Sequence, residues 1–153
     1  MTSSHILQAT INAKLSAGLH VVLAPGIYTL DTALVIAQPG QVLLGLGMAT
    51  LVSGKGDAVV AVTSKAAGAR VAGLLLQAGH FQTATLLRWG DRAGDAGDAA
   101  NPGVLSDVFG RVGGPDAPAP APEVQADVLL TINSDNVVID NTWYVEIRNL
   151  RSC

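Results

Sequence analysis

Two carboxylates late in the chain, Asp135 and Asp140, are of the residue type that hydrolyses glycosidic bonds. That chemistry uses one carboxyl group as an acid and another as a base or nucleophile, roughly 5–9.5 Å apart. Asp107 and Asp127 are more distant members of the same set. The run 133–136, Asn-Ser-Asp-Asn, is also typical of a turn whose side chains bond to backbone and stack between neighbouring turns. Because the sequence fixes no partner for either carboxylate, we predict no catalytic residue and keep Asp135 and Asp140 as the candidates.

Gly45 and Gly47 follow an apolar run and match part of a dinucleotide-binding fingerprint. In that fingerprint, glycines let a pyrophosphate approach the N-terminus of a helix. Thr50 stands where the third glycine belongs, and residues 51–54 are not typical of a helix. A tight bend between strands explains the same glycines, so we expect no cofactor.

Metal-site and nucleophile motifs are weak. His5, His20 and His80 are far apart, with neither metal-ligand spacing nor a Gly-x-Ser-x-Gly signature. Asp95 and Asp98 could offer oxygen ligands to calcium, but they lack the ligand spacing of an EF-hand. We predict a solvated loop there and no metal site.

Three aromatic residues could stack on sugar rings: Trp89, Trp143 and Tyr144. Only 4% of the chain is aromatic. Core packing, or capping of an open end of the fold, is the competing interpretation for these large apolar side chains.

The composition limits the class of protein. The chain has 153 residues, 9 Lys+Arg, 12 Asp+Glu and 49% hydrophobic residues, which is unlike a disordered segment. One domain with a sizeable core is expected at this length. No basic excess indicates a nucleic-acid partner. Cys153, the single cysteine, cannot form an internal disulfide, so cysteine usage leaves the compartment unknown.

Residues 32–54 carry no charge and are long enough to cross a bilayer. Pro39 and several glycines would break a helix there, whereas two buried strands around a turn explain the same residues. We therefore predict no membrane span. Residues 1–18 lack a basic region followed by an apolar core, so no signal peptide is predicted.

The chain changes from one helix to short apolar runs. Residues 4–18 fit an amphipathic helix with Ser4 as N-cap and Gly18 after its last turn. The runs that follow have strand-like length and residue type, at 21–23, 34–36, 42–44, 59–62, 74–76, 128–130 and 137–139. No further helix of a dozen residues is visible, which excludes a doubly wound α/β sheet.

Three segments can be laid over one another: 33–45, 58–76 and 127–140. Val35 and Val60 are 25 residues apart, close to one coil of a solenoid, whose repeats run from roughly 20 to 45 residues. The overlay predicts an all-β fold, a single-stranded parallel β-solenoid with an N-terminal capping helix. Its strands stack in parallel instead of pairing as hairpins.

Segments rich in Ala, Gly, Asp and Pro interrupt these coils and are predicted as loop insertions. The predicted organisation is one domain over 1–153, with a capping helix at 4–18, first coils at 20–90, insertions at 91–103 and 113–125, a further coil at 126–145 and a divergent tail at 146–153.

Segments 8–18 and 21–30, the latter with Pro-Gly-Ile-Tyr, resemble the entry of right-handed parallel β-helix proteins of the pectate lyase superfamily. Segments 42–51, 105–114 and 132–143 resemble more closely secreted microbial proteins often labelled coagulation factor 5/8 type domain proteins. Those proteins are similar to family 55 exo-β-1,3-glucanases. The resemblance covers residues 4–143 and implies a right-handed β-helix, an extracellular location and a polysaccharide partner.

The sequence departs from this family after Trp143. Family members continue with a Trp-Arg-Ala-Asp-His-like stretch and further coils, whereas residues 144–153 follow here. The resemblance thus implies the N-terminal segment of a secreted carbohydrate-active protein, truncated and inactive alone, with the catalytic residues of its glycoside hydrolase or polysaccharide lyase-like relatives in coils not present. The alternative is a non-catalytic structural or protein-interaction solenoid, which could self-associate through its open ends.

Overall fold

The computed structural model describes residues 3–112 and 126–146. In this part of the chain one helix, α1 (Ser3–Ser16), precedes all the strands. The strands are β1 (Val21–Leu23), β2 (Ile27–Leu30), β3 (Leu34–Ile36), β4 (Val42–Ser53), β5 (Val60–Val62), β6 (Arg70–Gln77), β7 (Thr83–Trp89), β8 (Gly103–Val112), β9 (Ala126–Ile132), β10 (Val137–Asp140) and β11 (Trp143–Glu146).

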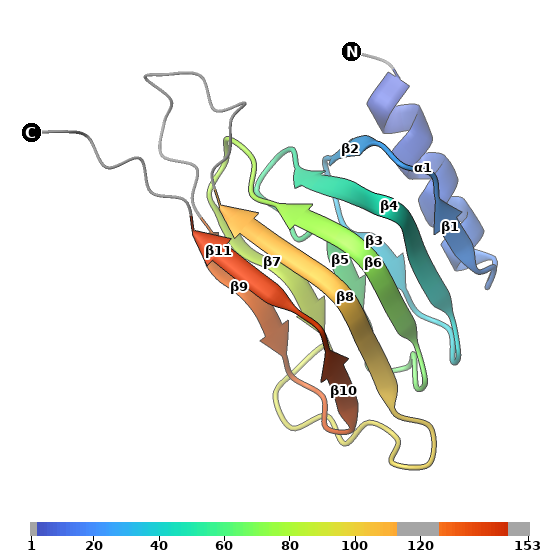
Figure 1. Ribbon diagram of the computed structural model, residues 1–153. Helices are drawn as coiled ribbons and strands as arrows, with labels where there is room; N and C mark the ends of the chain where they lie inside the picture. The colour runs from blue at the N-terminus through green and yellow to red at the C-terminus, as the bar shows by residue number, and fades with distance from the viewer. Residues whose placement is uncertain (1–2, 113–125, 147–153) are drawn as a thin grey trace, which may run out of the picture.

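The strands form two sheets, and every described strand pair is parallel. Sheet A has the order β1-β4-β6-β8-β10, with β2 also beside β4 and β11 beside β8. Sheet B has the order β3-β5-β7-β9. From β3 to β10 the chain alternates between the sheets, which face each other in Figure 1. The predicted parallel stacking is confirmed, and hairpin pairing is excluded for these strands.

The register of the coils corrects the sequence overlay in two places. Val35 pairs with Ala61 and not with Val60, a shift of one residue. The overlay also leaves out one coil between its second and third segments, because β7 lies between β5 and β9 in sheet B. Leu87 of β7 lies between Val60 and Leu130 in the ladder. Strands β7 and β8 therefore make a third coil that the overlay skipped.

The core lies between the two sheets and is built from columns of register partners. Three columns run through the first three coils with no member more than 3% exposed: Leu34–Val60–Leu87, Ile36–Val62–Trp89 and Leu43–Val71–Leu105. Each coil thus buries the inward side chains of the coil before it.

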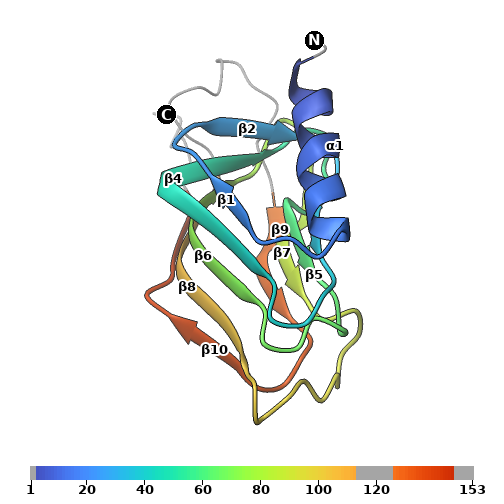
Figure 2. The ribbon, with the colours of Figure 1, turned by 90° about the vertical axis from the view of Figure 1, so that its right-hand side faces the viewer.

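Helix α1 covers the end of the stack where sheet B begins (Figure 2). Ile11 and Leu15 are buried in the core. The Asn12 side-chain amide donates to the carbonyl oxygen of Ala33 (2.9 Å), and its oxygen accepts from the amide N–H of Val35 (3.0 Å). This one side chain takes the backbone positions that a neighbouring strand would occupy on β3, so the first edge of sheet B is capped.

The C-terminal end of α1 comes two residues before the predicted boundary, at Ser16. The N–H of Gly18 donates to the oxygen of Leu15 (2.9 Å), and the N–H of Leu19 donates to the oxygen of Lys14 (3.1 Å). This pattern is a Schellman motif, which confirms the predicted glycine after the last turn.

No helix in the described residues is long and apolar enough to cross a membrane. The uncharged run 32–54 folds as β3 and β4 around a turn, as predicted. Predicted insertion 113–125 and residues 147–153, which include Cys153 and most of the predicted tail, lie outside the described residues.

Candidate functional site

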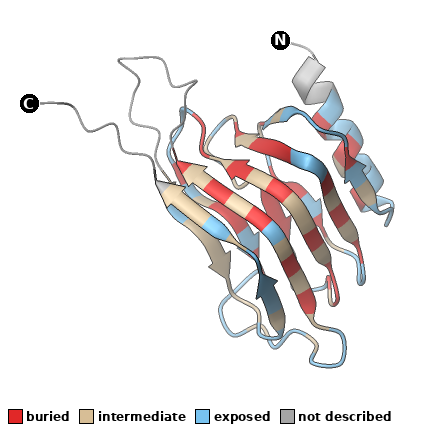
Figure 3. Ribbon diagram, viewed as in Figure 1, coloured by how far each residue is buried: buried red, intermediate tan, exposed pale blue. Residues whose placement is uncertain are grey.

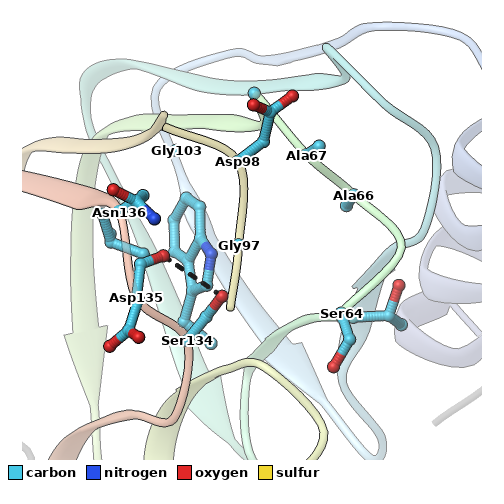
Figure 4. Close-up of a pocket in the computed structure, with 13 residues that line it drawn as sticks. Ser64, Ala66, Ala67, Gly97, Asp98, Gly103, Ser134, Asp135 and Asn136 are labelled. Carbon is cyan, nitrogen blue, oxygen red and sulfur yellow. Dashed lines mark hydrogen bonds between the residues drawn. The ribbon is translucent and has the colours of Figure 1, made fainter. Parts of the chain in front are cut away.

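A shallow pocket lies on the turns that connect the two sheets on one side of the stack. It is open to solvent, and its lining consists of Thr63, Ser64, Ala66, Ala67, Gly68, Trp89, Gly97, Asp98, Gly103, Ser134, Asp135, Asn136 and Val137 (Figure 4). Trp89 is only 3% exposed, and a Cβ atom at Gly103 would lie 2.4 Å from its ring. Trp89 therefore packs in the core and does not offer a face to a sugar.

Asp135 belongs to a turn that is tied to the loop before β8. Its N–H donates to the carbonyl oxygen of Asp95 (2.7 Å), and the side chain of Asn136 donates to the oxygen of Ala96 (2.8 Å). A Cβ atom at Gly97 would lie 2.1 Å from the Asp135 oxygen, so this close approach requires glycine. These contacts hold the turn to the neighbouring loop. They agree with the interpretation of residues 133–136 as turn-forming, which was the alternative to a catalytic role.

The predicted acidic candidates are not brought together. Asp135 precedes β10 and Asp140 is its last residue, so the two lie toward opposite ends of this strand. Asp98 and Asp135 both line the pocket, but their carboxylates point away from each other (Figure 4). Asp127 is exposed and accepts a hydrogen bond from Gln82 (2.9 Å).

A corner on sheet A brings a different acidic residue beside β10. Gly73, Asp107 and Asn141 occupy equivalent places in successive coils, and their φ angles are 68°, 52° and 48°. The Asn141 amide donates to Asp107 Oδ1, and the Ser106 hydroxyl donates to Asp107 Oδ2 (3.1 Å). Side-chain stacking at a coil corner, predicted for residues 133–136, occurs at this corner between Asp107 and Asn141.

Beyond this corner sheet A presents side chains to solvent in a regular array. Leu75, Phe109 and Trp143 are register neighbours on three adjacent strands, and Trp143 is 66% exposed. On the same face, Arg111 Nε donates to the Gln77 side-chain oxygen (2.9 Å). We call these five residues the outer array. An apolar platform beside amide and guanidinium donors is suited to stacking on a sugar ring and bonding its hydroxyls.

Tyr144 points to the opposite side of its strand from Trp143. A Cβ atom at Gly110 would lie 2.4 Å from the Tyr144 ring. Its hydroxyl is buried and has no hydrogen-bond partner among the described residues, and burial raises the pKa of Tyr144 to about 12. Of the three aromatic candidates, only Trp143 is available to a ligand.

The dinucleotide interpretation of Gly45 and Gly47 is wrong, because both lie within β4 and no helix follows. A Cβ atom at Gly45 would lie 2.4 Å from the carbonyl oxygen of Gly73 in the next coil. The register of β4 against β6 also shifts between Leu44 and Ala49. The glycines therefore permit a bend and a close approach between coils, as the competing interpretation held.

The candidate metal ligands are dispersed in the described residues. Nδ1 of His20 accepts a hydrogen bond from the N–H of Val42 (3.1 Å), and His80 is exposed. Asp98 accepts from the N–H of Ala100 (2.9 Å) within its own loop. Residues 3–112 and 126–146 hold no group of three His, Cys, Asp or Glu placed to bind a metal ion. The side chain of His5 is outside the described set.

Comparison with known proteins gives consistent matches. A family model described as the LAM55 pectate lyase-like domain matches residues 2–148. An exo-β-1,3-glucanase of Streptomyces sp. (strain SirexAA-E / ActE) is 38% identical over 134 residues, which are 88% of this chain and 21% of that protein.

Two solved structures of sacteLam55A from Streptomyces sp. SirexAA-E are similar to the fold. One matches with a TM-score of 0.83 and 37% identity over 93% of this chain and 25% of that protein. The other, a variant in complex with glucose, matches with a TM-score of 0.82 and 37% identity over 92% and 24% of the two chains. The chain spans about a fifth to a quarter of the length of these relatives.

Proposed function

Because the chain belongs to the family of LAM55 pectate lyase-like domains, we propose that it is a β-1,3-glucan-binding part of a carbohydrate-active protein. We propose also that it does not hydrolyse glucan by itself. One observation carries the proposal: almost the whole chain matches this family, and a member 38% identical to it is an exo-β-1,3-glucanase.

The arrangement of the acidic candidates supports the proposed absence of hydrolysis. Asp135 and Asp140 lie toward opposite ends of β10, and the carboxylate of Asp135 also points away from that of Asp98 in the pocket. Both carboxylate oxygens of Asp107 accept hydrogen bonds within its own corner. The Asp107 carboxylate therefore supports its corner, and the proposed activity is binding without cleavage.

The outer array is the proposed contact for glucan. Trp143 offers an exposed indole face, and Phe109 extends the apolar strip on the adjacent strand. Arg111 lies two residues beyond Phe109 on β8, and Gln77 lies two residues beyond Leu75 on β6. Both side chains can bond to sugar hydroxyls. A sheet surface with aromatic groups on one line and polar groups on the next suits a chain of sugar rings lying across the strands.

Affinity electrophoresis in gels that contain laminarin tests this function. We expect laminarin to retard the chain, and we expect Trp143→Ala or Arg111→Gln to weaken the retardation about tenfold. Phe81→Ala is the matched control, because Phe81 is 57% exposed but lies outside the array. Mobility in gels that contain pectin shows whether any retardation is specific to laminarin. Glucose release from laminarin measures hydrolysis.

Three results would contradict the proposal. The first is equal mobility with and without laminarin. The second is retardation that Trp143→Ala and Phe81→Ala reduce equally. Glucose release well above that of a heat-denatured sample would overturn the inactivity half alone, leaving the binding half to be judged by the gels.

We also propose the finer features of fold and location. Crossover connections between parallel strands of one sheet are right-handed in about 98% of cases, which supports a right-handed, closed β-helix for this chain. The family resemblance supports an extracellular location. Detection of the native gene product in culture medium, and not in cells, tests that location.

A non-catalytic interaction module is the second candidate function. The specific observation in its favour is the exposed apolar surface of the last described coil, where Val128, Val138 and Ile139 are 44–49% exposed. Exposed apolar side chains gathered on neighbouring strands are typical of an interface between proteins.

A further inference from the structure

The outer array is part of a longer row of side chains that crosses sheet A from β11 to β2. The strand register connects five uncharged residues: Ile27 of β2, Thr50 of β4, Leu75 of β6, Phe109 of β8 and Trp143 of β11. Leu51 and Leu76, the next residues along β4 and β6, are fully buried. Because side chains alternate between the faces of a strand, the row lies on the outward face. Figure 3 shows this alternation of buried and less buried residues along β6 and β8.

A second row accompanies the first on the same face, two residues further along each strand. Its members are Thr29, Val52, Gln77, Arg111 and Val145. Two residues of a strand advance by about 6.6 Å, so the two rows form a strip about as wide as one sugar ring. Polar groups stand at two places along this strip, at Thr29 beside β4 and at the Gln77–Arg111 pair.

The strip is longer than the outer array. Neighbouring strands lie about 4.8 Å apart, so the strip extends about 19 Å from β2 to β11, and the array covers about 10 Å of it. A sugar residue adds a length close to one strand spacing to an extended chain. A glucan that crosses the whole strip therefore has about five residues, and one that covers only the array has about three.

Ile27 is the member of the row that the outer array leaves unexplained. It is 71% exposed, although single exposed apolar residues are common on protein surfaces. The backbone on both sides of it is fixed. The N–H of Thr50 donates to the oxygen of Gly26 (2.8 Å), and the hydroxyl of Tyr28 donates to the oxygen of Ala24 (2.9 Å). Ile27 is thus held in solvent in line with the array, which lowers the entropy cost of binding a ligand there.

We propose that Ile27 and Thr29 form a far subsite, so that one β-1,3-glucan chain lies across sheet A from Trp143 to Ile27. The proposal rests on the glucan binding proposed above for the outer array. Ile27 packs against the apolar face of a sugar ring, and the hydroxyl of Thr29 bonds to the hydroxyls of that sugar. Affinity therefore rises with chain length until the strip is covered, and a trisaccharide bound at the array does not reach Ile27.

Isothermal titration calorimetry of the full chain with β-1,3-linked glucose oligomers, from the trisaccharide to the heptasaccharide, tests the far subsite. We expect the dissociation constant to fall about tenfold from the trisaccharide to the pentasaccharide, and to change by less than about twofold from the hexasaccharide to the heptasaccharide. The plateau marks the length at which the strip is covered.

Two variants separate the ends of the strip. Ile27→Ser should raise the dissociation constant of the hexasaccharide about tenfold and leave that of the trisaccharide unchanged. Trp143→Ala should weaken the binding of every oligomer. Val22→Ser is the matched control, because Val22 is 57% exposed on β1, which also pairs with β4, but lies outside the strip. It should leave every dissociation constant unchanged.

Equal affinity for the trisaccharide and the hexasaccharide would overturn the far subsite. So would an Ile27→Ser variant that binds the hexasaccharide as wild type does, or one that loses as much affinity for the trisaccharide. Each of these results leaves glucan binding by the array in place, provided that Trp143→Ala weakens the trisaccharide. Absence of binding to every oligomer would overturn the proposed function together with the subsite, so the two failures are distinguishable.

Discussion

The contact between Asn12 and β3 gives the sharpest prediction about stability. Its side chain makes two hydrogen bonds to the main chain, to Ala33 and from Val35. Each neutral hydrogen bond contributes about 0.5–1.5 kcal/mol net, so their loss amounts to about 1–3 kcal/mol. Ala33 is only 8% exposed, and its carbonyl would keep little access to water. We therefore expect Asn12→Ala to lower the free energy of unfolding by about 2–3 kcal/mol.

Urea unfolding measures this loss. The fluorescence of Trp89, which is buried in the third coil, reports on the core. With a denaturant slope of about 2 kcal/mol/M, the midpoint of Asn12→Ala should fall by roughly 1–1.5 M. Lys14→Ala is the control on the same helix; since Lys14 is exposed, its midpoint should move by less than about 0.3 M. Asn12→Asp keeps an acceptor for Val35 but loses the donor to Ala33, so its midpoint should also fall.

The reasoning would be refuted if Asn12→Ala and Lys14→Ala unfolded at the same urea concentration. That result would mean that water satisfies the edge of β3 as well as the side chain does. A fall in Asn12→Ala with no fall in Asn12→Asp would show that the bond to Val35 carries the effect alone.

Three further predictions concern the turns and the last coil. Gly97→Ala should lower the free energy of unfolding by about 1–3 kcal/mol more than Gly94→Ala, since both glycines have positive φ but only Gly97 meets the Asp135 oxygen; equal losses in urea titrations would contradict the steric argument. Because the folded chain holds the Tyr144 proton up to a pKa of about 12 and the unfolded chain loses it near 10, stability should fall as pH rises from about 10 to 12. Tyr144→Phe should remove the part of this loss of stability that comes from Tyr144. A pH profile of the urea midpoint that is the same in wild type and Tyr144→Phe would contradict this origin. At Asp107, whose φ is 52°, replacement by Val should cost about 1–2 kcal/mol more than replacement by Gly, as thermal unfolding will show; a Val variant as stable as the Gly variant would contradict it.

Parallel stacking was predictable from the sequence because buried parallel strands are short and apolar, and two such coils lie close together in the chain. The third coil was not predictable by the same means. Strand β7 begins Thr83-Ala-Thr85, and Arg88 interrupts its apolar end, so no run of three Val, Leu or Ile marks it. The overlay matched apolar runs, and it therefore passed directly from β5 to β9.

The outer array was likewise predictable only in part. Trp143 was singled out by its residue type, but its neighbour Phe109 is 34 residues away and Leu75 a further 34. Those separations depend on the lengths of the connections between coils, which no local pattern fixes. The truncation, the coagulation factor 5/8 resemblance and the domain boundaries stay predictions.

The two ends of the stack show why a solenoid needs different solutions for its first and last coils. A helix has no free edge to add to a β ladder, so α1 can close sheet B only through a side chain that carries both an N–H donor and a carbonyl acceptor. Asn12 supplies both groups in the geometry of a peptide, while Ile11 and Leu15 cover the inward columns. The one helix of the described residues packs against β1, β2 and β3, so no described helix lies over the columns of the last described coil. The strands of that coil keep one edge without a partner among the described residues, so strands, and not a helix, are the elements that fit this end.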